Sequence, residues 1–92
     1  MAQVEKGTIG WGILNPGQSH IWTWYVSGGD VWHFWAHNNS LAYGQNRVRV
    51  EWVNCMQQDG GYRIAEIHVR NVHAWPQPAT WVGYVLHYTR IF

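Results

Sequence analysis

The sequence predicts an all-β fold, a single compact antiparallel β-sandwich of about six to eight short strands, with a small barrel as the alternative. Proline and glycine divide the chain into short extended segments, and aromatic and β-branched residues fill these segments. No window shows a sustained helical period of apolar residues. Because the chain has 92 residues, we expect one β domain spanning residues 1–92.

The composition favours a stable globular chain despite its small size. Apolar residues make up 47% of the sequence, charged residues make up 12%, and eight residues are Trp. Large aromatic side chains bury much area per residue, which offsets the limit that a short chain sets on its core. Low charge together with high aromatic content argues against intrinsic disorder.

Charge and cysteine content limit which binding partners and which cellular locations we expect. The formal net charge is +1 and the basic residues are spread along the chain, so we expect no nucleic-acid partner. The single cysteine, Cys55, cannot form an internal disulfide, and we expect its side chain to be buried or half-buried. No signal-peptide core and no membrane-spanning apolar run is present. This predicts a soluble protein, either cytoplasmic or a processed secreted domain.

The first half of the chain predicts one weak strand followed by a hairpin. Residues 7–14 form the first strand, and Asn15, Pro16 and the following Gly-Gln end it in a turn. Residues 19–37 then contain two aromatic and β-branched runs on either side of a Gly-Gly pair, a pattern typical of a β-hairpin.

The expected hairpin register assigns the aromatic residues to two faces. We expect Val26 to pair with Val31, and side chains alternate along each strand. The pairs that then share one face are His20 with His37, Trp22 with Trp35, and Trp24 with His33. The opposite face, which we expect to be the core side, carries Ile21, Tyr25, Trp32 and Phe34. Because both faces are aromatic, we expect the first face to contact a ligand or another subunit.

The middle of the chain predicts a crossing loop, a strand and a second loop. Residues 38–46 are polar and long enough to cross between sheets. Residues 47–53 alternate between apolar and charged side chains, which predicts a half-exposed strand. Its expected inward residues are Val48, Val50 and Trp52. Residues 55–61 end in Asp-Gly-Gly and are interpreted as a loop.

The last third predicts two more strands separated by a proline-containing segment. Residues 62–72 form the first of these strands, and its expected apolar face carries Ala65, Ile67 and Val69. Two prolines exclude residues 72–79 from a central strand. Residues 80–91 form the final strand, which is apolar on both faces. One of its faces carries Val82, Tyr84, Leu86 and Tyr88, and the other carries Trp81, Val85 and Ile91.

The mixture of indole rings with histidine and asparagine predicts a carbohydrate-binding function. Sugars stack their C–H faces on indole, while their hydroxyls need fixed hydrogen-bonding groups. We therefore expect a non-enzymatic, lectin-like binding module that becomes multivalent by homo-oligomerisation. The candidate ligand-binding residues are Trp22, Trp24, His33, Trp35, His37, Asn38 and Trp75. The alternative is a structural or self-assembly module whose aromatic faces make protein contacts only.

The sequence supports neither catalysis nor a metal site. The five carboxylates form no facing pair, and no nucleophile elbow or phosphate-binding loop occurs. His20 and His37 could approach each other in the expected hairpin. However, His33 would lie roughly 13 Å along the strand from His37. We therefore expect no catalytic residue, no metal and no cofactor.

Overall fold

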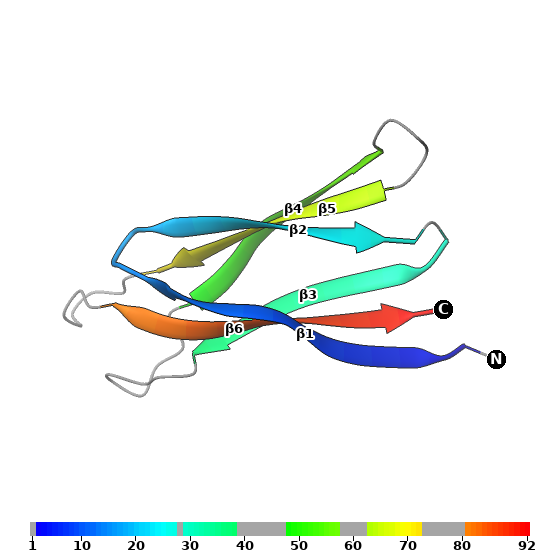
Figure 1. Cartoon of the computed structure of the whole chain (residues 1–92), viewed down its shortest axis with the longest axis horizontal. Coiled ribbons are helices and arrows are strands. Elements are labelled where there is room, and N and C mark those ends of the chain that lie inside the picture. The colour runs from blue at the N-terminus through cyan, green and yellow to red at the C-terminus, as the bar shows by residue number, and fades with distance from the viewer. Residues whose placement is uncertain (1, 28, 39–47, 58–62, 73–80) are drawn as a thin grey trace.

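A computed structural model describes residues 2–27, 29–38, 48–57, 63–72 and 81–92, and these contain six strands and no helix. Two three-stranded antiparallel sheets pack against each other, with strand orders β1-β6-β3 and β2-β5-β4 (Figure 1). The strands are β1 Val4–Leu14, β2 Ser19–Val26, β3 Val31–Asn38, β4 Val48–Gln57, β5 Arg63–Asn71 and β6 Val82–Ile91. The prediction of an all-β sandwich is confirmed.

The expected hairpin between β2 and β3 is wrong, because the two strands lie in different sheets. Strand β2 pairs with β5, which places Trp22 opposite Ile67. Strand β3 pairs with β6, which places Trp35 opposite His87. The chain therefore crosses between the sheets after Val26. This crossing lets aromatic residues of both strands share one interior, whereas a flat hairpin would leave one aromatic face in water.

The crossing also reverses the expected faces of β2. Ile21 and Tyr25 were expected in the core but are 58% and 71% exposed. Trp22 and Trp24 point inward and pack against the core instead. In β3 the expected core side is confirmed, since Phe34 is buried and Trp32 packs against the core.

Strand β4 corrects three further expectations, and a β-bulge explains the first of them. The register shifts between Val50 and Trp52, and one extra residue moves every later side chain to the opposite face. Trp52 was expected to point inward, but it lies on the outer face, 45% exposed, and stacks on His68 at a centroid distance of 4.8 Å. The strand also continues into the segment interpreted as a loop. It includes Cys55, which is exposed rather than buried or half-buried.

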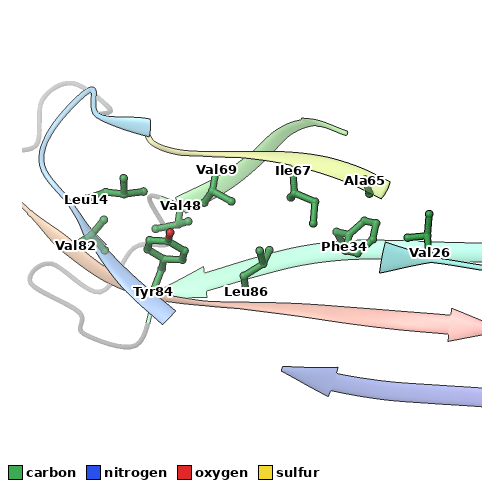
Figure 2. Close-up of a cluster of buried hydrophobic side chains, with 10 residues drawn as sticks. All are labelled: Leu14, Val26, Phe34, Val48, Ala65, Ile67, Val69, Val82, Tyr84 and Leu86. Atoms are coloured by element: carbon green, nitrogen blue, oxygen red, sulfur yellow. The ribbon is translucent and has the colours of Figure 1, made fainter. Parts of the chain in front are cut away.

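The core forms where β5 and β6 face each other. Ala65, Ile67 and Val69 of β5 are fully buried, as the alternation predicted. Figure 2 shows Ile67 and Val69 pointing across the space between the sheets toward Leu86 and Tyr84 of β6. The phenol oxygen of Tyr84 lies 2.8 Å from both His20 Nδ1 and Trp22 Nε1, and the indole N–H donates to it.

Strand β1 ends in the fully buried Leu14, but two of its glycines meet core aromatic rings with backbone alone. A Cβ atom added at Gly10 would lie 2.7 Å from the Trp22 ring, and one at Gly12 would lie 3.1 Å from Tyr84. The glycines therefore allow both aromatic rings to lie directly against the strand.

Candidate functional site

A cavity lies between the two sheets, at the end of the molecule that holds both chain termini and the β2–β3 connection (Figure 1). Its volume is about 440 Å³, within the usual range for small-molecule sites. Aromatic walls come from Trp24, Trp32 and Tyr88, and charged walls come from Glu5, Arg63 and Arg90. An apolar hollow with a few polar groups is the typical form of a binding site for a small ligand.

Three aromatic rings from both sheets form the apolar part of this cavity. Tyr88 of β6 lies between Trp24 of β2 and Trp32 of β3, with a centroid separation of 5.5 Å to each ring. The interplanar angles are 35° and 44°, so the rings meet obliquely and do not close into a stack. A Cβ atom added at Gly7 of β1 would lie 2.6 Å from Tyr88. Gly7 therefore allows the tyrosine ring to rest on β1.

An ion-pair network holds Arg90 at one side of the cavity. Its Nε donates to Asp30 Oδ2 at 2.7 Å, and the Ser27 hydroxyl donates to the same oxygen at 2.7 Å. The Ser27 hydrogen bond and the Arg90 guanidinium both hold the pKa of Asp30 below its ordinary value. The Arg90 guanidinium carbon also lies 5.4 Å from the centroid of the Trp32 ring, within the range of a cation–π interaction.

Glu5 and Tyr88 form a second polar contact at the cavity wall. The Tyr88 hydroxyl donates to Glu5 Oε1 at 2.8 Å. This bond favours the protonated phenol, so it raises the pKa of Tyr88. Glu5 Oε2 also lies 4.0 Å from Arg90 Nη1. Glu5 therefore links the aromatic wall to the charged wall.

Two hydrogen-bond donors at the cavity have no acceptor among the described residues. Arg63 begins β5 opposite Val26 on the inward face of its sheet, and no ion pair is formed by it within the described ranges. The buried Trp32 Nε1 has no hydrogen-bond partner there either. Both residues also line a neighbouring cavity of about 290 Å³, which extends toward Val53 and Cys55 of β4. The two hollows therefore meet at Trp32 and Arg63.

A second cluster lies on the outer face of the β1-β6-β3 sheet. His37 Nε2 of β3 lies 2.8 Å from His87 Nε2 of β6, and the two rings stack with an interplanar angle of 9°. Trp35 stacks on the His87 ring at a centroid distance of 4.3 Å. The outer nitrogens also have partners: His37 Nδ1 lies 2.9 Å from the Asn38 carbonyl oxygen, and His87 Nδ1 lies 3.3 Å from Thr8 Oγ1.

The hydrogen bonds of this cluster assign a proton position to each neutral ring. The Asn38 carbonyl can only accept, so His37 Nδ1 carries a hydrogen and His37 Nε2 accepts. His87 Nε2 then donates to His37, and His87 Nδ1 accepts from the Thr8 hydroxyl. Burial lowers the pKa of His87, and the neighbouring His37 lowers it further. Each of the four ring nitrogens thus has a hydrogen-bond partner while both imidazoles are neutral.

The structure distributes the described sequence-predicted site residues over four environments. Trp24 lines the large cavity and His33 lines the smaller one. Trp35, His37 and Asn38 meet at the outer cluster, where Asn38 contributes its carbonyl oxygen. Trp22 is tied to the Tyr84 hydroxyl at the core. Trp75 lies outside the described residues.

The sequence prediction missed residues that complete the cavity and the histidine pair. Glu5, Arg63, Tyr88 and Arg90 line the cavity, and His87 completes the histidine pair. The alternation of the last strand does place Tyr88 on the face of Tyr84 and Leu86, which was a usable signal. The other contacts depend on which strands become neighbours, and this leaves no local trace in the sequence.

Two further features are absent from the described residues. Within the described ranges, no three His, Cys, Asp or Glu side chains gather as a metal-binding group. The same part of the chain has no helix long and apolar enough to cross a membrane. No family model matches the chain, and neither a curated protein nor a solved structure matches it.

Proposed function

We propose that this protein is a non-enzymatic carbohydrate-binding module, and that a sugar ring occupies the cavity between the two sheets. The observation that carries the proposal is a hollow of about 440 Å³ in which three aromatic rings and three charged side chains converge. The site uses Trp24 from the set expected from the sequence, together with Trp32 and Tyr88.

The chemistry of a sugar suits this combination of walls. Its C–H face packs on aromatic rings, and its hydroxyls both donate and accept hydrogen bonds. Among the described residues, Arg63 has no ion-pair partner and the Trp32 indole N–H has no acceptor, while the Glu5 carboxylate is an acceptor. A polyhydroxylated ring can satisfy both kinds of group, whereas a purely apolar ligand would leave the donors unpaired.

A glycan microarray followed by calorimetric titration of the strongest glycan tests the proposal. Trp24→Ala removes one aromatic wall and is expected to weaken binding by about tenfold, as loss of one stacking contact implies. Trp24→Phe keeps a smaller ring and is expected to retain part of the affinity. Trp52→Ala serves as the matched control, because Trp52 is a half-exposed tryptophan on the outer face of the same sheet, turned away from the cavity that Trp24 lines.

The proposal fails if the wild-type protein binds no glycan on the array. It also fails if Trp24→Phe and Trp24→Ala both bind as tightly as the wild type. Thermal unfolding of each variant identifies those that fold, and only these are compared. The Trp52→Ala variant is expected to match the wild-type affinity within about twofold.

A second candidate function is self-assembly through the outer face of the β1-β6-β3 sheet. Trp11, Ile13 and Val31 are all more than half exposed on this face. The strand register puts no Asp or Glu there among the described strand residues. Large exposed apolar side chains on a face without acidic residues favour a subunit interface, and a second copy of the chain would also make the sugar site multivalent.

Sedimentation velocity tests self-assembly independently of sugar binding. Trp11→Glu replaces the most exposed tryptophan of this face with a carboxylate and is expected to shift the protein to a monomer. Thr23→Glu changes an exposed residue of the other sheet and is expected to leave the sedimentation coefficient unchanged. A wild-type protein that sediments as a monomer at high micromolar concentration rules out this candidate.

A further inference from the structure

We propose that His37 and His87 form a two-imidazole site for a divalent late transition-metal ion on the outer face of the β1-β6-β3 sheet. The site is separate from the sugar cavity and does not depend on the function proposed for it. The sequence had suggested His20 as the partner of His37. The structure instead brings together two histidines that lie 50 residues apart in the chain.

Convergence of the two Nε2 atoms is the first observation that supports a metal. They face each other at 2.8 Å, and the rings are nearly parallel at a centroid distance of 4.9 Å. With tetrahedral zinc bonds of about 2.0–2.1 Å, two ligating nitrogens lie roughly 3.3 Å apart. The two Nε2 atoms therefore need to move apart by about half an ångström, and the rings need to turn so that both lone pairs point at the ion.

The partners of the two Nδ1 atoms are the second observation. Histidines that bind metals usually use the other ring nitrogen to hydrogen-bond a carbonyl, carboxylate or water, which fixes the ring orientation. His37 Nδ1 has this partner in the Asn38 carbonyl oxygen, and His87 Nδ1 has Thr8 Oγ1. Trp35 stacked on His87 restrains that ring further.

The proton balance of metal binding is also satisfied. In the metal-free pair, His87 Nε2 carries a hydrogen and donates it to His37. When an ion binds both Nε2 atoms, that hydrogen is lost to solvent while His87 Nδ1 gains one from solvent, so the neutral ring changes tautomer. The Thr8 hydroxyl, which donated to His87 Nδ1, then accepts from it. No net proton is released and no polar group becomes unpaired.

The donor set selects the class of ion. Two neutral imidazoles suit zinc, copper and nickel, whereas calcium and magnesium require oxygen ligands. No third His, Cys, Asp or Glu joins the pair within the described residues. Water on this exposed sheet face completes the coordination shell, so we expect moderate rather than very tight affinity.

Calorimetric titration of the untagged protein with Zn²⁺ tests the proposal, with Mg²⁺ as the negative control ion. We expect one Zn²⁺ per chain and no binding of Mg²⁺. His37→Ala and His87→Ala each remove one ligand and are expected to weaken Zn²⁺ binding by about tenfold or more. His33→Ala is the matched control. His33 is an exposed histidine on the same face of β3 as His37, but it does not belong to the His37–His87 pair.

Histidine side-chain NMR of the full chain gives a second readout that does not depend on mutant folding. Zn²⁺ is expected to shift the Nε2 resonances of His37 and His87 and to move the His87 proton to Nδ1. Thr8→Val keeps the side-chain shape but removes the hydroxyl, and a weaker loss of affinity is expected from it. The proposal is overturned if wild-type protein binds no Zn²⁺, if His33→Ala weakens binding as much as His87→Ala, or if Zn²⁺ shifts other histidines only.

Discussion

The two ends of the sandwich differ in what their inward-facing side chains do. At one end, Leu14, Tyr84 and Leu86 are completely buried. At the other end, the inward positions of the same strands carry Tyr88 and Arg90, and a cavity of about 440 Å³ separates the sheets. Within β6 the inward face thus changes from fully buried side chains to Tyr88 and Arg90, which line a cavity.

Strand β5 shows the same change along its length. Val69, Ile67 and Ala65 contribute aliphatic side chains to the closed end, and Arg63 follows them on the same face at the open end. Small apolar side chains let two sheets approach closely. Large rings and solvated guanidinium groups keep the sheets apart. The change of inward-facing side chains along β5 and β6 therefore determines where the cavity lies.

The largest expected effect is a core truncation at the closed end. Leu86→Ala removes a fully buried side chain, and we expect it to lower the free energy of unfolding by about 2–5 kcal/mol. Trp24→Ala at the open end is expected to lower it less, because one side of that ring already faces a cavity. Urea denaturation of both variants measures the difference. Equal losses would show that the two ends are packed alike.

A smaller effect is expected from the tyrosine hydroxyls. Tyr84→Phe leaves the partly buried Trp22 Nε1 and His20 Nδ1 without their shared partner, and about 1–3 kcal/mol of stability should be lost. Tyr88→Phe removes a hydrogen bond to the exposed Glu5. Because water replaces that bond, the loss of stability in Tyr88→Phe should be clearly smaller. Urea denaturation measures both losses. The prediction is wrong if Tyr88→Phe lowers the free energy of unfolding more than Tyr84→Phe does.

The pH dependence of stability should reveal the Asp30–Arg90 pair at the open end. The pKa of Asp30 is held below 3.8 in the folded chain, so the unfolded chain binds the proton more tightly. The stabilisation is therefore fully present above that ordinary value and disappears as the pH falls through the folded-state pKa. Melting temperatures of wild type and Asp30→Asn between about pH 2 and pH 6 should differ at the upper end and converge at the lower end. A gap that stays constant down to the lowest pH contradicts this assignment.

The smallest expected effect is at Arg63. This exposed arginine forms no ion pair within the described ranges. Arg63→Gln should therefore change the free energy of unfolding by no more than about 0.5 kcal/mol. The same substitution should weaken glycan binding, because it removes a charged donor from the cavity wall. A large loss of stability would show that Arg63 supports the fold rather than a ligand.

Features that depend on one strand alone could be predicted from the sequence. The inward faces of β5 and β6 follow from alternation within each strand, and the sandwich class follows from the number of such strands. By contrast, the partner of β2 is β5, about 40 residues away, and no local pattern specifies it. The bulge before Trp52 also could not be foreseen, because the sequence alternates through it without interruption.

The candidate sites were harder to predict for the same reason. Trp24 and His37 were identified by residue type, but their neighbours come from strands remote in the chain. Assigning both to one hairpin face joined residues that the crossing places on different sides of a sheet. Sugar binding by aromatic residues remains a proposal. The proposed site is now the cavity between the sheets and no longer one face of a hairpin.

The crossing of the chain after Val26 has a kinetic consequence. Among the described strand pairs, only β4 with β5 joins neighbours in sequence, while β1, near the start, pairs with β6, near the end. Contacts between such distant segments require large loops to close before any stabilising contact forms, and folding is correspondingly slow. During synthesis β1 has no partner until the final strand emerges. Its unpaired edge is exposed to aggregation during that interval.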